Sequence, residues 1–211
     1  RPVPVRPGAH YMIGGILVDI DGRSTIPGVW AVGECVSSGL HGANRMGSNS
    51  LLEGMVLGEL AGRGAALASE TNSRHRPSRI LRRKLDEAPC GIELGISDLL
   101  YSMKALMWRH VGLERDATLL EEAKEHLAFW FDATRRLAPA ETRAWELVNM
   151  LTVANLATIG ADGREESRGV HYRTDFTGVC TPSHTCIEPV QMENHCVASE
   201  ISRVAVGLTC G

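Results

Sequence analysis

The sequence contains no apolar run that could cross a membrane, because no window approaches about 18 consecutive apolar residues. It also lacks an excess of positive charge. Lys and Arg total 22 against 25 Asp and Glu, so we expect no broad nucleic-acid-binding surface. The start, RPVPVRPG, has none of the apolar core of a signal peptide. The 211 residues are 44% hydrophobic, which is typical of one large or two small globular domains.

No pair of cysteines with the spacing CxxC occurs among the six cysteines, and they are too widely spread for a small disulfide framework. We therefore expect reduced thiols and a cytoplasmic protein. The tail does gather Cys180, His184, Cys186, His195 and Cys196, but their spacing fits no common zinc pattern. We predict no metal site, and a metal bound by this tail is kept as a minor alternative.

Glycine is concentrated in the first third of the chain and predicts tight turns there. A short strand is predicted over 14–20, closing in a turn at Asp21-Gly22. After a second turn at Pro27-Gly28, the apolar run 29–32 predicts a buried strand of an α/β sheet. From Leu51 onward, apolar residues follow a helical period.

The middle of the chain is helical in pattern. Three stretches carry apolar stripes at i, i+3, i+4 spacing, around 99–107, 120–131 and 145–156, and predict a three-helix bundle. Trp108, Trp130 and Trp145 are expected to anchor its core. The predicted organisation is an α/β part over 1–68, a polar linker over 69–79, the helical domain over 80–176, and a tail over 177–211 of unpredicted structure.

Residues suited to binding a ligand are dense between 33 and 53. Gly33-Glu34 places a carboxylate at the carboxyl edge of the predicted sheet, where α/β proteins bind ligands. Arg45 offers a planar fork suited to a carboxylate. Ser50 and Leu51 begin a helix whose free N–H groups suit an anionic or electron-rich group. His10, just before a double glycine, would by itself more often be structural than catalytic.

Taken together, these motifs resemble the succinate dehydrogenase, fumarate reductase and L-aspartate oxidase flavoprotein family. The resemblance rests on three blocks and a closing signature: His10-Tyr11 with Gly14-Gly15, Pro27-Gly28 with Ala31 and Gly33-Glu34, the run from His41 to Glu53, and Glu166 to His171 with Arg173 and Asp175. Thr177 departs from the proline usual in the family. Leu40 and the segment from Met107 to Gly112 are closer to the L-aspartate oxidase branch.

The resemblance implies an FAD-dependent oxidoreductase that acts on a four-carbon dicarboxylate. For the favoured branch, L-aspartate would become iminoaspartate on the route to quinolinate and NAD. Carried over by motif, Glu34 would hold the FAD ribose, and Ser50 and Leu51 would contact the flavin ring. His10 and Arg45 would bind the substrate carboxylates and are the expected catalytic residues. The fold implied is an α/β remnant of an FAD-binding domain, with short strands and a helix, followed by the α-helical three-helix-bundle domain.

One family motif is lacking. No Gly-x-Gly-x-x-Gly follows an N-terminal strand, and the first residue is Arg rather than Met. We therefore expect a C-terminal portion whose partner is the missing N-terminal FAD-binding segment, and which is inactive without it. Two alternatives stay open: a fragment of a succinate dehydrogenase or fumarate reductase flavoprotein acting on succinate or fumarate, and a non-catalytic helical interaction module.

Overall fold

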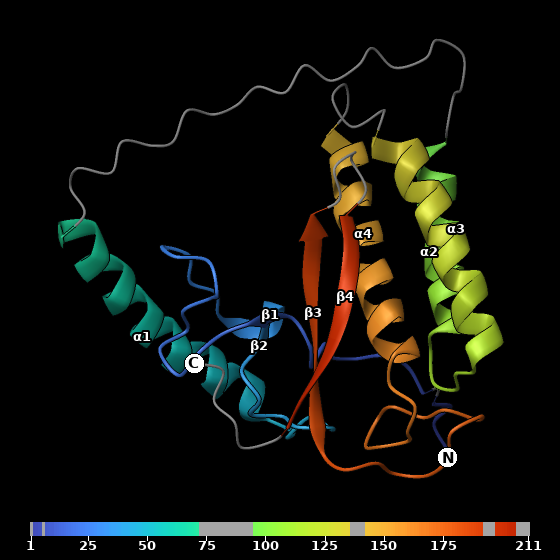
Figure 1. Cartoon of the computed structure of the whole chain (residues 1–211), viewed down its shortest axis with the longest axis horizontal. Helices are drawn as coiled ribbons and strands as arrows, with labels where there is room; N and C mark the ends of the chain where they lie inside the picture. The colour runs from blue at the N-terminus through green and yellow to red at the C-terminus, as the bar shows by residue number, and fades with distance from the viewer. Residues whose placement is uncertain (1, 6, 72–94, 136–141, 192–196, 206–211) are drawn as a thin grey trace. The chain divides into compact units, whose positions relative to one another are not determined.

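The structure of the chain, a computed structural model, describes residues 2–5, 7–71, 95–135, 142–191 and 197–205 (Figure 1). The chain divides into two compact units, residues 1–83 and 84–211. Helix α1 (Asn49–Thr71) includes the first three residues of the predicted linker, and 72–79 lie outside the described residues. The domain boundaries drawn from the sequence stay predictions.

The first unit contains two short parallel strands. Strand β1 (Ile16–Leu17) pairs with β2 (Val36–Ser37), and the 3-10 helix η1 (Gly33–Cys35) leads directly into β2. Gly15 permits this close pairing, because a Cβ atom there would lie 2.3 Å from the carbonyl oxygen of Cys35. The short strands and helix expected of an α/β remnant are confirmed.

The face of helix α1 that packs on the core of this unit is not the one that the apolar pattern predicted. Glu53, Leu57 and Ala61 are only 6–7% exposed, and their spacing of four residues places them on one face. Leu57 packs with the buried Val18 and Val36. The helix predicted from residue 51 is therefore confirmed, but most of the apolar positions used to predict it point outward, whereas Leu60 packs on the core. Four of them are 58–82% exposed: Leu51, Leu52, Met55 and Val56.

The buried strand predicted over 29–32 is wrong. Among the described residues, its only ladder contact is an isolated bridge between Trp30 and Arg23, and Val29 is exposed. The preceding turn is as predicted: Gly28 has a φ of 82°, and the Val29 N–H donates to the Ile26 carbonyl. An apolar run becomes a strand only where a partner strand pairs with it, and this run pairs at one residue.

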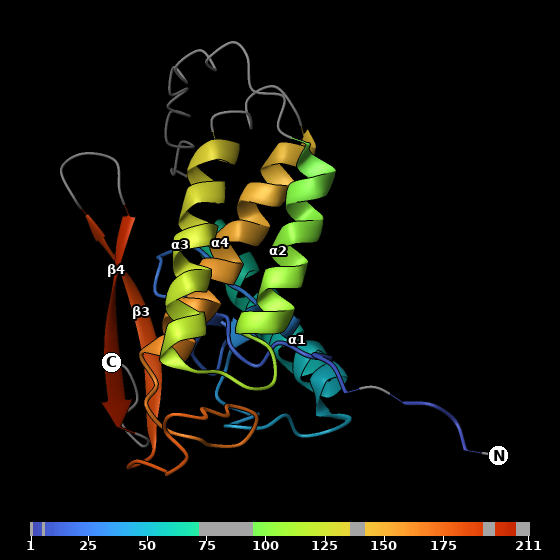
Figure 2. The same cartoon turned by 90° about the vertical axis from the view of Figure 1, so that its right-hand side faces the viewer.

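The second unit contains the predicted three-helix bundle. Helices α2 (Ile96–His110), α3 (Ala117–Arg135) and α4 (Thr142–Asp162) lie side by side in both views (Figures 1 and 2). The predicted stripes supply the core, which is formed by residues such as Leu120, Leu127 and Leu151, all fully buried. The apolar period therefore predicted the number and position of these helices, and their inward face except at Trp145 and Leu156 of α4, which are exposed.

The tryptophans were predicted to anchor this core, and for two of the three that is wrong. Trp130 is partly buried and packs against the core cluster. Trp108 and Trp145 are 39% and 48% exposed. The bundle interior is filled by Leu and Ala side chains, such as Ala123, which let the helices approach closely. The larger indole rings lie at its margin, where their N–H groups can reach water.

The tail for which the sequence predicted no structure forms a β-hairpin. Strand β3 (Ser183–Gln191) pairs antiparallel with β4 (Val197–Ala205) over nine residues each. Strand β3 contacts α4, and the Ile187 side chain would lie 3.5 Å from a Cβ atom at Gly160. Arg164, just after α4, donates to the Ser183 carbonyl from both Nη atoms. The helical bundle therefore supports the hairpin along one strand.

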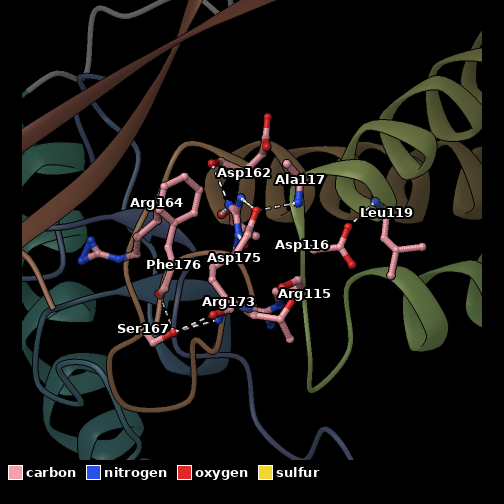
Figure 3. Close-up of polar contacts among 12 residues, drawn as sticks. Arg115, Asp116, Ala117, Leu119, Asp162, Arg164, Ser167, Arg173, Asp175 and Phe176 are labelled. Atoms are coloured by element: carbon pink, nitrogen blue, oxygen red, sulfur yellow. Dashed lines mark hydrogen bonds and ion pairs between the residues drawn. The ribbon is translucent and has the colours of Figure 1, made fainter. Parts of the chain in front are cut away.

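An ion pair between a buried arginine and a partly exposed aspartate joins the helix ends of this unit (Figure 3). The Arg173 side chain is 1% exposed, and its Nη1 donates to the carbonyls of Ala161 and Asp162 at the end of α4. Its Nε and Nη2 bond both carboxylate oxygens of Asp175 at 2.8 Å. Asp175 also accepts from the Ala117 N–H at the start of α3. These bonds hold the pKa of Asp175 far below its usual range, with the Arg173 bond as the largest cause.

His171 lies among arginines in the same network. Arg115 Nη1 donates to its Nδ1 at 2.7 Å, and its Nε2 bonds the Arg164 carbonyl at 3.0 Å. Because Nδ1 accepts, the ring is neutral with its proton on Nε2. Burial lowers the pKa of His171, and the positive charges of Arg115, Arg164 and Arg173 lower it further.

The lowered pKa of His171 predicts that acid destabilises the second unit. The pKa of His171 is lower in the folded than in the unfolded chain. Its contribution to the free energy of unfolding is therefore complete above about pH 6.5 and is lost as the pH falls. Urea unfolding followed between pH 7.5 and 5 should show a declining free energy of unfolding. His171→Gln, which keeps an acceptor and a donor but does not titrate, should flatten this decline. His126→Gln, at an exposed position on α3, is the control. Equal slopes in the wild type and His171→Gln would contradict the assignment.

Removing Arg173 should cost much more stability than removing a surface arginine. Arg173→Met leaves the Asp175 carboxylate without its cation and two carbonyls without a donor, which should lower the free energy of unfolding by about 3 kcal/mol. Arg135→Met breaks an exposed pair with Asp132 and should change it by less than about 0.5 kcal/mol. Chemical denaturation of both variants measures the difference, and equal losses would show that the Arg173–Asp175 pair is not special.

Candidate functional site

The predicted site residues of the first unit gather where the loop after β2 enters α1. This loop turns tightly, with positive φ values at Gly39, Gly42 and Ser48. The segment 10–12 is bonded to the same region, because Met12 bonds Glu34 and Tyr11 contacts the loop. The fold therefore brings together three pieces of chain that the sequence had singled out separately.

Arg45 is held in one orientation by two neighbours. Its Nε donates to the Ser50 hydroxyl at 2.7 Å, and its Cζ lies 4.6 Å from the centre of the Tyr11 ring. Among the described residues, neither Nη atom has a recorded hydrogen bond. A guanidinium fixed at Nε with both Nη atoms open can take both oxygens of a carboxylate.

His10 directly precedes Tyr11 and is exposed. Since the Tyr11 ring packs under the Arg45 guanidinium, the backbone that carries His10 is tied to the Arg45 loop. Both predicted substrate-binding residues thus belong to one region. The role of each residue remains a prediction.

Glu34 lies in η1 with an exposed side chain. Its Oε1 accepts from the Met12 N–H at 2.9 Å, and Oε2 has no recorded hydrogen bond in the described part of the chain. One carboxylate oxygen is thus used to hold the segment after His10, and the other stays open to a ligand hydroxyl.

Ser50 and Leu51 lie in the first turn of α1, as predicted. The N–H groups of a first helical turn have no partner within the helix. The Ser50 hydroxyl accepts from Arg45, whereas the Leu51 side chain points into open space. The helix start therefore offers free backbone donors beside an exposed apolar side chain, a combination suited to a flat ring with polar edges.

A buried pair, His41 and Glu53, was not predicted as part of the site. The Nε2 of His41 lies 3.0 Å from Glu53 Oε2, and both side chains are almost fully buried. The Ser38 hydroxyl also donates to this carboxylate. The sequence held one signal: Glu53 lies four residues before the buried Leu57, on the same face of α1. That signal was hidden because the apolar residues around it face outward.

The described residues contain no group of three or more His, Cys, Asp and Glu that could hold a metal ion. Cys180 is exposed, and its backbone N–H donates to the Glu166 carboxylate. This bond makes Cys180 part of the polar network of the second unit. His195 and Cys196, also part of the minor metal alternative, lie outside the described residues. No helix in the described ranges is long and apolar enough to cross a membrane.

Two family models match the chain, one in each unit. The model described as "FAD binding domain" matches residues 1–51, and "Fumarate reductase flavoprotein C-term" matches residues 101–179. The first match contains the three predicted blocks up to Leu51. The second covers α2 from Tyr101 onward, all of α3 and α4, and the closing signature.

Individual relatives include L-aspartate oxidases and fumarate reductase flavoprotein subunits. The chain is 36% identical over 204 residues to L-aspartate oxidase 2 of Ralstonia nicotianae, covering 96% of this chain and 36% of that protein. It is 37% identical over 195 residues to the fumarate reductase flavoprotein subunit of Mycobacterium tuberculosis, covering 82% of this chain and 33% of the relative. The chain thus spans about a third of the length of these relatives.

A solved structure agrees with the sequence relatives. E. coli quinol fumarate reductase FrdA matches with a TM-score of 0.83 and 30% identity, covering 100% of this chain and 39% of that one. Two family models, relatives of both kinds and a matching structure agree, and the chain belongs to the family of succinate dehydrogenase, fumarate reductase and L-aspartate oxidase flavoproteins.

Proposed function

We propose that this chain forms the substrate-carboxylate and flavin-ring side of an FAD-dependent L-aspartate oxidase, which converts L-aspartate to iminoaspartate. The observation that carries the proposal is Arg45, whose guanidinium is oriented by Ser50 and Tyr11 while both Nη atoms stay open. A fixed cation beside a helix start that suits a flat ring is what the oxidation of an anionic substrate by a flavin requires.

The residues present fit FAD in two places. The open oxygen of Glu34 can accept a hydrogen bond from a ribose hydroxyl. The N–H groups of Ser50 and Leu51 can donate to the polar edge of the isoalloxazine ring, and the exposed Leu51 side chain gives its face an apolar contact. When bound, FAD supplies the acceptor for the hydride that leaves the substrate carbon.

Two side chains would divide the work of binding the dicarboxylate. Arg45 would take one carboxylate through two parallel N–H bonds, which fixes the position and the plane of that group. An N–H of the His10 imidazole would bond the second carboxylate. Holding both ends of a four-carbon substrate leaves its central carbons little freedom, so the C–H bond that breaks can be aligned with the acceptor.

A fumarate reductase or succinate dehydrogenase flavoprotein is the second candidate. It is favoured by the fumarate reductase relative at 37% identity and by the match to quinol fumarate reductase at a TM-score of 0.83. The same two carboxylate contacts would serve succinate or fumarate equally well. The L-aspartate assignment rests on Leu40 and on the segment from Met107 to Gly112.

The chain would complete this site only together with a polypeptide that carries a dinucleotide-binding motif. The 211 residues contain no Gly-x-Gly-x-x-Gly after a strand, and that motif is what holds the pyrophosphate of FAD against a helix start. The contacts offered by Glu34, Ser50 and Leu51 reach the ribose and the ring but leave the pyrophosphate unbound. A cytoplasmic location is part of this proposal.

We therefore expect the 211-residue chain to bind FAD weakly by itself. Titration followed by flavin fluorescence and absorbance should show no stoichiometric complex at micromolar concentrations. Adding the dinucleotide-binding segment of a related L-aspartate oxidase should restore binding and L-aspartate-dependent flavin bleaching. Riboflavin, which lacks the pyrophosphate, is the control, and its binding should be the same with and without the added segment. Tight FAD binding by the chain alone would show that its half of the site is self-sufficient.

In the completed protein, Arg45→Ala should reduce kcat/KM for L-aspartate by at least about 100-fold. Two charge-assisted hydrogen bonds to the substrate are lost, each worth about 1.5–3 kcal/mol. Arg45→Lys should recover little, because an ammonium group cannot make both bonds in one plane. Arg23→Ala, at an exposed arginine paired with Asp21, is the matched control and should act as wild type.

The same assay separates the two candidate functions. Oxidation of L-aspartate with little activity on succinate supports the oxidase, and the reverse preference supports the second candidate. An Arg45→Ala protein with unchanged kinetics on either substrate would refute the carboxylate role of Arg45.

A further inference from the structure

Glu53 is a buried carboxylate that no cation neutralises within the described part of the chain. Its Oε2 receives the His41 Nε2 bond at 3.0 Å, and the Tyr11 hydroxyl lies 3.5 Å from the same oxygen. Its Oε1 accepts from the Ser38 hydroxyl. Burying a carboxylate costs free energy unless its oxygens are bonded, so these neutral donors must stay in place around Glu53.

His41 extends this constraint to the loop that carries Arg45. Its Nδ1 accepts from the Met46 N–H at 3.3 Å, which places the ring proton on Nε2, where it bonds Glu53. The His41 carbonyl accepts from the Asn44 N–H at 3.2 Å. The residues on both sides of Arg45 are therefore bonded to His41.

Tyr11 provides a second connection between Glu53 and Arg45. Its hydroxyl points to the Glu53 carboxylate, its ring meets the His41 ring edge-on at 5.3 Å, and its face lies under the Arg45 guanidinium. One buried carboxylate thus contacts the Tyr11 ring that lies under the Arg45 guanidinium and the His41 ring that bonds the loop carrying Arg45.

We propose that Glu53 is a positioning residue for Arg45. It holds His41 in the Nε2–H form, His41 holds the N–H groups on either side of Arg45, and Tyr11 supports the guanidinium. The inference rests on the proposed function only for what Arg45 binds. The connection from Glu53 to the loop belongs to the chain itself and can be tested without flavin or substrate.

A merely structural Glu53 would behave differently. If it served only to pack α1 against the strands, its loss would loosen the whole unit, including the amides of Leu57 and Ala61 further along the same face. If it positions the loop, its loss should act on Met46 and on the Arg45 Nε–H while the middle of α1 stays protected.

The experiment is NMR on the 211-residue chain with three variants. Glu53→Leu removes the acceptor, Glu53→Gln keeps one acceptor oxygen without the charge, and Glu59→Leu changes an exposed glutamate on the same helix. Long-range ¹H–¹⁵N spectra report the His41 tautomer, and hydrogen exchange reports the Met46 amide and the Arg45 Nε–H. Leu57 and Ala61 amides serve as internal references.

In the wild type, Glu53→Gln and Glu59→Leu, we expect His41 to carry its proton on Nε2. In Glu53→Leu we expect a mixture of tautomers, with Met46 and Arg45 Nε–H exchange at least tenfold faster and the reference amides unchanged. A wild-type His41 protonated on Nδ1, an unchanged Met46 in Glu53→Leu, or equal acceleration at Leu57 would each overturn the proposal. A chain that fails to bind dicarboxylate in the completed protein would refute the proposed function and leave these results intact.

Discussion

The buried carboxylate of Glu53 is the constraint on which the first unit depends. Its side chain is almost fully buried, so its oxygens must be satisfied by the donors of Ser38 and His41, from the loop after β2, and of Tyr11, from the N-terminal segment. Meeting that requirement closes the loop after β2 onto α1 and brings the segment that carries His10 against it. The orientation of Arg45 follows from the same bonds. The bonds that stabilise this unit are therefore the same bonds that orient Arg45.

The second unit also contains a buried charge whose hydrogen-bonding atoms are satisfied, here the positive charge of Arg173. The buried guanidinium of Arg173 has its Nε and both Nη atoms bonded, to two carbonyls at the end of α4 and to Asp175, which in turn accepts from the start of α3. Helix ends leave backbone groups without partners, and a charged side chain placed between two ends satisfies several at once. His171 adds a neutral ring among arginines, and because its pKa is lowered in the folded chain, this network, unlike a hydrophobic contact, loses stability in acid.

How far the sequence predicted this structure depends on how local each signal was. The three helices of the bundle were predicted because Leu120, Leu127 and their neighbours repeat within one helix and face a core made by the same unit. Leu51 and its apolar neighbours have the same period but face outward, because period indicates a helix and not which face is covered. The hairpin of β3 and β4 gave no signal, because neither strand alternates cleanly between apolar and polar residues, although the two strands are neighbours in sequence. Glu53 was missed because a charged residue is expected outside, and only its bonds explain its burial.

Within the described structure, the charged groups of the candidate site are bonded differently from the buried charges of Arg173 and Glu53. Arg173 donates hydrogen bonds from Nε and both Nη atoms, and Glu53 accepts hydrogen bonds at both carboxylate oxygens. Arg45 and Glu34 are each bonded at one atom and open at others: Arg45 at Nε with both Nη atoms open, Glu34 at Oε1 with Oε2 open. Under the proposed function, Arg45 and Glu34 would already be oriented when a ligand arrives, because folding has met the free-energy cost of fixing them.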